Sequence, residues 1–281
     1  MNVGFQVNMV CFSQTGNTQK VAEAMGDTFE EKGCQFRIIP FEMADPAEAV
    51  KCDVFAVGCP CFASKAPTPV INFIQDIPSL QDKPVFVFST SGGSPGRVLY
   101  DLKVASEKKG GNVIGGLLIR GELFYPVPCV FGRFPGRPNE EDLSKAKQFA
   151  QGVYKYIESN STYYLNEGHP KILNRRLNFY YIAGLMMTDP MIRLLLPKPK
   201  AEQDKCNECG TCEDNCPAQS IALNPFPKFN TKCIRCYRCL TVCPKEAISI
   251  NKTLANVAVF SFYNTWFGRV FGDMEKGEIL Y

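Results

Sequence analysis

Short apolar runs alternate with amphipathic, helix-like stretches through the first half of the chain. Five runs have the length and alternation of strands: Val3–Phe12, Gln35–Phe41, Val54–Gly58, Pro84–Ser89 and Asn112–Ile119. Helical spacing of apolar residues marks the stretches between and after them: Asn17–Lys32, Thr68–Ile77, Gly96–Lys109 and Asn139–Glu158. Strands that alternate with helices predict a doubly wound α/β fold with a parallel sheet. Such a sheet binds its ligand beyond the carboxyl ends of its strands.

The pattern changes after about residue 158, and this change predicts the domain limits. Residues 159–200 mix aromatic, basic and proline residues, which indicates a partly helical connector rather than a flexible Gly/Ser linker. The expected units are an α/β domain at 1–158, this connector at 159–200, a cysteine-rich module at 201–252 and an apolar tail at 253–281. The tail is too apolar for a free end, so we expect it to pack back as a helix, on the body or on a partner chain.

The most apolar stretch of the connector, Leu177–Leu196, is interrupted by Asp189, Pro190 and Arg193. A transmembrane helix needs about 20 apolar residues without such breaks. A packed pair of helices is therefore expected, with peripheral membrane contact as the alternative.

Charge and composition narrow the function. The net charge of +3, from 31 basic and 28 acidic residues, does not indicate a nucleic-acid-binding protein. The chain has a single histidine, His169, so histidine-based zinc sites and catalytic triads are poor hypotheses. The fourteen cysteines could indicate a secreted disulfide protein, but the N-terminus lacks a basic, cleavable leader. A reducing, anaerobic cytoplasm is the expected location.

Eight of the cysteines form two copies of one motif, CNECGTCEDNCP from Cys206 and CIRCYRCLTVCP from Cys233. Each copy reads C-x2-C-x2-C-x3-C-P, in which three thiolates surround one [4Fe–4S] cluster and the fourth ligates the other cluster. We therefore expect one cluster on Cys206, Cys209, Cys212 and Cys243, and a second on Cys233, Cys236, Cys239 and Cys216. Zinc is the alternative, because C-x2-C pairs also bind zinc. The module closely resembles bacterial two-cluster ferredoxins, over about 50 residues.

A hydroxyl-rich loop, SQTGNT at Ser13–Thr18, follows the first predicted strand and opens the first predicted helix. Backbone N–H groups and hydroxyls at such a position can surround a phosphate. An ordinary capped helix start is the alternative, since Ser, Thr and Asn favour N-caps. The chain has no GxGxxG dinucleotide motif and no GxxxxGK[ST] motif.

The TGNT sequence in this loop resembles the phosphate loop of flavodoxins, and the first 155 or so residues look like a flavodoxin. The resemblance implies bound FMN, with the loops after the third and fourth strands beside its ring. Cys61 and Phe62 depart from the usual bulky apolar residue and tyrosine of the second loop. The cofactor-binding residues that the resemblance implies are Ser13, Gln14, Thr15, Gly16, Asn17, Thr18, Pro60, Cys61, Phe62, Ala63, Ser64, Lys65, Thr90, Ser91, Gly92 and Gly93.

Two further features lie near this expected site. Cys59 and Cys61 could be thiols that act on the flavin, but small buried apolar residues are the simpler interpretation. The segment 121–138, which carries Tyr125 and Phe131, is long for a connection and could cover the cofactor.

With both modules joined, the chain resembles flavodoxin–ferredoxin fusion proteins of anaerobes. This resemblance implies FMN and two [4Fe–4S] clusters that relay low-potential electrons to and from partner proteins. A terminal FMN-dependent reductase of a small molecule is the alternative, with Tyr125, Cys61, Lys65 and Arg97 near the site by analogy only. A redox sensor is a third hypothesis for the function, and no DNA-binding motif in the sequence supports it. A head-to-tail homodimer would be one way to bring a cluster to the flavin.

Overall fold

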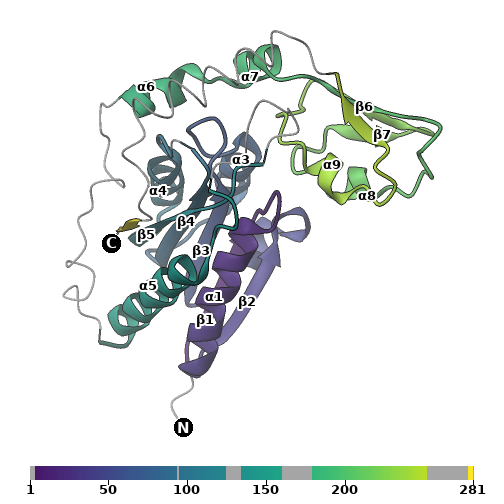
Figure 1. Cartoon of the computed structure of the whole chain (residues 1–281). Helices are drawn as coiled ribbons and strands as arrows, with labels where there is room; N and C mark the ends of the chain where they lie inside the picture. The colour runs from purple at the N-terminus through teal and green to yellow at the C-terminus, as the bar shows by residue number, and fades with distance from the viewer. Residues whose placement is uncertain (1–3, 94, 125–133, 160–178, 252–277, 281) are drawn as a thin grey trace.

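The structure is a computed structural model that describes residues 4–93, 95–124, 134–159, 179–251 and 278–280. Five parallel strands form its central sheet in the order 2-1-3-4-5 (Figure 1). They are β1 (Gln6–Cys11), β2 (Gln35–Pro40), β3 (Val54–Pro60), β4 (Pro84–Ser91) and β5 (Asn112–Arg120). All five predicted strands are thereby confirmed, and the sheet is of the doubly wound type that the alternation predicts.

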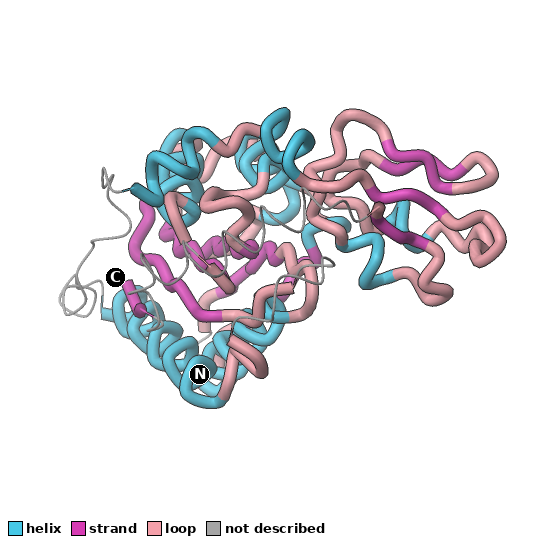
Figure 2. Tube along the Cα trace, turned by 45° about the horizontal axis from the view of Figure 1, so that its top comes forward, coloured by secondary structure: helices cyan, strands magenta, loops and turns pink. Residues whose placement is uncertain are grey.

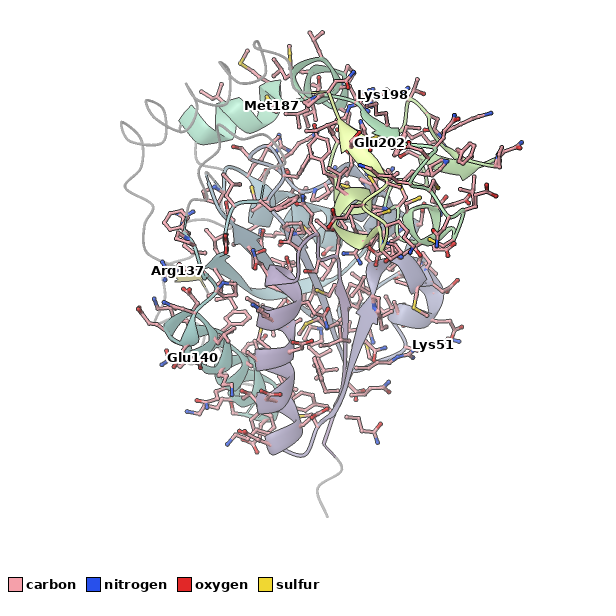
Figure 3. The ribbon with its side chains drawn as sticks, turned by 45° about the vertical axis from the view of Figure 1, so that its right-hand side comes forward. Lys51, Arg137, Glu140, Met187, Lys198 and Glu202 are labelled. Carbon is pink, nitrogen blue, oxygen red and sulfur yellow. The ribbon has the colours of Figure 1, made fainter. Side chains whose placement is uncertain are left out.

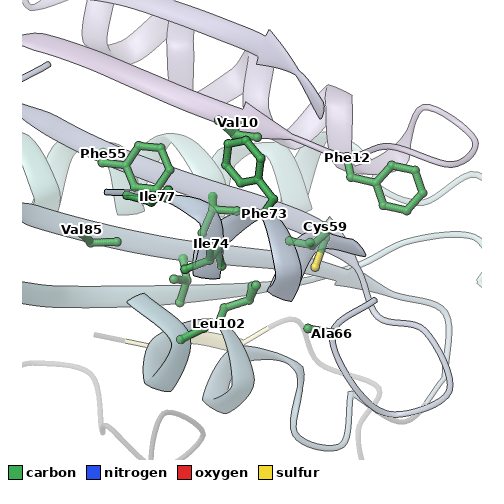
Figure 4. Close-up of a cluster of buried hydrophobic side chains, with 14 of the residues drawn as sticks. Val10, Phe12, Phe55, Cys59, Ala66, Phe73, Ile74, Ile77, Val85 and Leu102 are labelled. Carbon is green, nitrogen blue, oxygen red and sulfur yellow. The ribbon is translucent and has the colours of Figure 1, made fainter. Parts of the chain in front are cut away.

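Helices cover both faces of this sheet. On one face lie α1 (Asn17–Glu31) and α5 (Glu140–Ser159), and on the other α3 (Thr68–Asp76) and α4 (Val98–Lys108), with the single turns η1 (Phe41–Met43) and α2 (Pro46–Ala49) nearby. Neighbouring residues of one strand point to opposite faces, so Val10 packs with α3 and α4 while Met9 packs with α1 and α5. Figure 4 shows the first of these two cores, which includes Phe73, Ile74 and Leu102.

Glycines follow the ends of two of these helices. Gly33 and Gly110 follow α1 and α4 with φ of 79° and 78°, a left-handed conformation that glycine adopts without a steric cost.

The end of the tail differs from the prediction. Residues 278–280 were expected to be helical, but they form β10 (Glu278–Leu280), which pairs antiparallel with β5 of the same chain. A strand at this position covers the otherwise open edge of the sheet. The rest of the tail, including Trp266, lies outside the described residues.

The connector and the cysteine module follow as short elements (Figure 2). The connector contains two helices, α6 (Phe179–Met186) and α7 (Asp189–Leu195), which are separated by two residues. Within the module, β6 (Pro199–Ala201) pairs with β9 (Ile248–Ile250), and β7 (Ile221–Leu223) pairs with β8 (Pro227–Phe229). Two short helices, α8 (Thr211–Asp214) and α9 (Arg238–Val242), complete it. Strand β6 starts at Pro199, so it crosses the limit predicted at residue 200.

In the part of the chain that the structure describes, no helix has both the length and the apolar character to cross a membrane.

A buried ion pair fixes the chain before α5. Asp142 is fully buried and accepts hydrogen bonds from Arg137 Nε at 2.6 Å and Nη2 at 2.7 Å. Asp142 and Asn139 also accept reciprocal hydrogen bonds from each other's backbone N–H groups, both at 3.1 Å, which caps the helix. Arg137 and Glu140 lie at the start of α5 in Figure 3. The Arg137 carbonyl in turn accepts from the backbone of Glu122, at the carboxyl edge of the sheet.

We predict that Asp142→Asn lowers the free energy of unfolding by about 3 kcal/mol or more, because it leaves a mostly buried guanidinium without its counter-ion. The matched control is Glu141→Gln, which removes the neighbouring exposed partner of Lys145 and should change little. Urea unfolding followed by far-UV circular dichroism measures both variants. Equal stability of the two variants would show that the buried pair is not a structural anchor.

Candidate functional site

Four loops meet at the carboxyl edge of the sheet. They follow β1, β3, β4 and β5, and parallel strands bring all four to one side. Strands β1 and β3 are neighbours, but α1 and α3 go to opposite faces of the sheet, so this is the switch point of the topology, where open α/β sheets bind their ligands. The predicted cofactor residues lie on three of these loops, at the strand ends that lead into them, or, for Asn17 and Thr18, in the first turn of α1.

The loop after β1 has the geometry of an anion site. Gly16 is the N-cap of α1, with φ of 95°, and has no side chain to cap the helix. The Ser13 hydroxyl instead accepts from the backbone N–H groups of Gly16 and Gln19, both at 3.2 Å. The first turn of α1 has no acidic residue to offset the positive end of the helix dipole. The Ser13 hydroxyl thus satisfies two of these N–H groups, and the glycine and the uncompensated helix dipole are also compatible with a bound phosphate.

Hydrogen bonds tie this loop to its neighbours. The hydroxyls of Thr18 and Thr90 lie 2.8 Å apart, and both side chains are buried, which joins the first loop to the end of β4. The Asn17 amide donates to the Glu122 carbonyl at 3.0 Å and so joins the first loop to the chain after β5.

The loop after β3 turns toward the connector and the cysteine module. Phe62 and Lys65 bond to each other through their backbones, and Ala63 and Ser64 between them adopt left-handed φ values of 50° and 64°. Lys65 forms an ion pair with Asp189 of α7 at 2.9 Å. The Phe62 ring is buried against Ile192 and the cysteine loop around Cys236. Both side chains therefore contact the rest of the chain rather than lying free beside the sheet edge.

The loop after β4 rests on a buried arginine that the sequence analysis missed. Arg120, the last residue of β5, is 2% exposed and donates from Nη1 to the Gly93 carbonyl at 2.6 Å. A Cβ atom on Gly92 would lie 2.6 Å from the Leu123 Cβ, so glycine is needed for this close approach. The available signal was a charged residue at the end of the apolar run NVIGGLLIR. Tyr125 and Phe131, which were also expected near this site, lie outside the described residues.

Cys59 and Cys61 are neutral thiols in this setting. Burial raises the pKa of Cys61 to about 12, and burial together with the neighbouring Cys61 raises the pKa of Cys59 well above its ordinary value. Because only the thiolate is a good nucleophile, the interpretation as small buried apolar residues is favoured.

Two cavities in the cysteine module are each lined by cysteines of both motifs. The lining of the first includes Cys206, Cys209, Cys212 and Cys243; that of the second includes Cys216, Cys233, Cys236 and Cys239. The last cysteine of each motif thus lies with the first three of the other. Within the described residues, no three His, Cys, Asp or Glu side chains converge as a single metal ion requires. Thiol groups spread around a cavity fit an iron–sulfur cluster better than a zinc ion.

The two motifs also share their backbone conformation. Glu208 and Arg235, at equivalent positions, both have φ of 59°, and Gly210 and Tyr237 have φ of 76° and 60°. Each cavity has a hydroxyl close to a cysteine sulfur: Thr211 Oγ1 lies 3.3 Å from Cys209 Sγ, and Ser220 Oγ lies 3.3 Å from Cys216 Sγ. Hydrogen bonds to ligand sulfurs are one of the factors that set cluster potentials.

Comparisons with known proteins agree with both halves of this description. Residues 205–248 match the family described as 4Fe-4S dicluster domain. A flavodoxin from Megasphaera elsdenii is 28% identical over 116 residues, which is 40% of this chain and 85% of that protein. The chain joins a flavodoxin-like domain to a 4Fe-4S dicluster domain.

Other similarities concern the flavodoxin-like domain. An uncharacterized protein of Methanocaldococcus jannaschii, MJ0298, is 26% identical over 142 residues, which is 50% of this chain and 91% of that protein. The solution structure of the two-electron reduced Megasphaera elsdenii flavodoxin covers 52% of this chain and 98% of its own, at 26% identity and a TM-score of 0.41. The rubredoxin oxygen:oxidoreductase of Desulfovibrio gigas is 17% identical with a TM-score of 0.45, and the match spans 55% of this chain but only 36% of that enzyme.

We predict that Cys59 and Cys61 resist alkylation in the folded protein, because burial keeps both thiols protonated. Anaerobic treatment with iodoacetamide near neutral pH, followed by peptide mass spectrometry, measures this. The same residues in guanidinium-unfolded protein serve as the control and should be labelled. Rapid labelling of Cys61 before unfolding would mean that the loop after β3 exposes a reactive thiol.

Proposed function

We propose that the protein is an intramolecular electron relay between two [4Fe–4S] clusters and FMN, working between separate redox proteins. The observation that carries this proposal is one apolar contact between the domains. Phe62, Ala63 and Leu123, on loops at the carboxyl edge of the sheet, pack together with Cys236 and Tyr237 of the dicluster domain. This contact supports an FMN site and a cluster site that lie close together, so that transfer between them would need no bimolecular encounter.

The chain's own residues have distinct roles in this proposal. The N–H groups and hydroxyls at Ser13–Thr18 would hold the FMN phosphate at the start of α1. The loops at Pro60–Lys65 and Thr90–Gly93 would hold the ring between them and keep water out. Bound FMN supplies one- and two-electron chemistry, whereas each cluster supplies one-electron chemistry. We keep the proposed limit of the flavodoxin-like domain at 1–158. The dicluster domain, proposed at 201–252, is extended to residue 199 to include β6.

The terminal-reductase alternative receives less support from the side chains. Such an enzyme needs a proton donor beside the flavin. Of the expected candidates, Lys65 pairs with Asp189 and Arg97 pairs with Asp101 at 2.5 Å, and the Cys61 thiol has its pKa raised by burial. Electron partners of the relay would be proteins of a reducing compartment, and a homodimer is not required for the domains to meet.

We predict one releasable FMN and about eight iron and eight sulfide per chain after anaerobic purification. Cys216→Ser should damage the cluster on Cys233, Cys236 and Cys239, because the cavity of those three also includes Cys216. Cys243→Ser is the matched variant and should damage the other cluster. Iron and sulfide analysis with electron paramagnetic resonance separates the two. Zinc without sulfide would contradict the presence of iron–sulfur clusters. Damage in each variant only to the cluster on the first three cysteines of its own motif would contradict the crossed ligation.

We predict that reduced clusters pass electrons to FMN at a first-order rate that does not depend on protein concentration. Stopped-flow mixing with a limiting chemical reductant, monitored at the flavin band, measures this rate over a range of concentrations. An isolated flavodoxin-like domain mixed with reduced full-length protein would give the collisional rate for comparison. A rate in proportion to concentration in the full chain alone would exclude the internal relay.

A further inference from the structure

The two cluster cavities differ in their contact with the flavodoxin-like domain. The cavity of Cys206, Cys209, Cys212 and Cys243 is lined entirely by residues between 206 and 248, all in the dicluster domain. The loop that carries Cys236, a lining residue of the other cavity, packs directly against Phe62. The second cavity therefore borders the domain contact.

Polar contacts attach this same loop to the proposed phosphate loop. The Gln14 side-chain amide donates to the Cys236 carbonyl. In the other direction, Arg238 donates from Nη1 to the Ser13 carbonyl, and the Thr241 hydroxyl donates to the Gln14 carbonyl at 3.3 Å. These contacts join residues more than 220 positions apart in the sequence.

Arg238 also forms an ion pair across the domains. Its Nε lies 2.9 Å from Glu42 Oε1 on η1, and the two side chains are only 19% and 10% exposed. Its Nη2 donates to the Asn215 side chain at 3.3 Å, beside Cys216. One guanidinium thus contacts η1, the phosphate loop and the residue next to a cysteine of the second cavity. A bidentate or multiple contact of this kind is specific to arginine, because lysine presents a single charged centre.

We propose that the cluster on Cys216, Cys233, Cys236 and Cys239 is the direct electron partner of the flavin, and that Arg238 is the residue that positions it. This inference rests on the proposed relay function. One electron leaves this cluster and one electron is gained by the flavin, with an external one-electron donor to restore the cluster. Electron transfer slows exponentially with distance. A residue that fixes the position of the cluster loop therefore controls the rate of electron transfer to the flavin.

The first test is Arg238→Gln in the full protein with all cofactors bound. The concentration-independent rate of flavin reduction should fall by about tenfold or more, since a small displacement of a reacting pair has effects of this order. Lys205→Gln is the matched control, because it removes an equal charge from an exposed ion pair with Glu202 in the dicluster domain, away from the contact. Its rate should equal that of the unaltered protein.

Two further variants separate positioning from general damage. Glu42→Gln breaks the same ion pair from the other domain, and the double variant Glu42→Gln/Arg238→Gln should be no slower than Arg238→Gln alone. Arg238→Lys keeps the charge opposite Glu42 and should restore part of the rate. Iron, sulfide and FMN contents should stay the same in all of these proteins.

A matched pair of hydroxyl variants tests which cluster is the direct partner. Ser220→Ala removes a hydroxyl beside Cys216, and Thr211→Val removes one beside Cys209. Loss of a hydrogen bond to a ligand sulfur lowers the potential of that cluster alone and makes it a stronger donor. With both clusters reduced beforehand, Ser220→Ala should raise the first-order rate more than Thr211→Val.

The outcomes distinguish this inference from the relay itself. A larger effect of Thr211→Val would reverse the cluster order, and an unchanged rate in Arg238→Gln would remove its positioning role. Both of these results leave the rate independent of concentration, so the relay would stand. A rate that depends on concentration in the unaltered protein would instead overturn the relay.

Discussion

The position of the site follows from the point where β1 and β3 lie side by side while the helices that follow them leave on opposite faces. No helix can cover the sheet edge there, so loops alone form its boundary. The Ser13 hydroxyl, the buried Thr18–Thr90 pair and the Asn17–Glu122 hydrogen bond all lie at this edge. The dicluster domain packs against the same loops, so one topological constraint places both proposed cofactor sites at a common boundary.

The local pattern of the sequence was sufficient for the elements that depend on near neighbours. Strand and helix periodicity predicted the five parallel strands and their four covering helices, because each buries one face or alternates in and out of the core. The cysteine spacing also accounts for three of the four cysteines that line each cavity, since tight loops with left-handed residues bring together cysteines a few positions apart; the fourth comes from the other copy of the motif. Glu208 and Arg235 show this most clearly, with the same φ in both copies.

Contacts between distant parts of the chain could not be predicted in this way. The pairing of β10 with β5 joins residues about 160 apart, and nothing in the sequence EIL specifies its partner strand. Arg120 was missed because a buried arginine is defined by the carbonyl it meets, here that of Gly93. Arg238 lies inside a cysteine motif whose spacing is already explained by the cluster ligands. Nothing in the sequence therefore marks its contact with Glu42.

The covering of Phe62 and Leu123 by the dicluster domain has a consequence for how the molecule exchanges charge with its surroundings. Both residues follow strands of the central sheet, β3 and β5, and lie at its carboxyl edge. Here that edge is covered by the chain's own second domain, and a visiting protein would have to displace it. Other proteins would therefore bind to other faces, among them the one where Cys209 is exposed. If the proposed relay operates, electrons would enter through the dicluster domain at a face distinct from its contact with the flavodoxin-like domain.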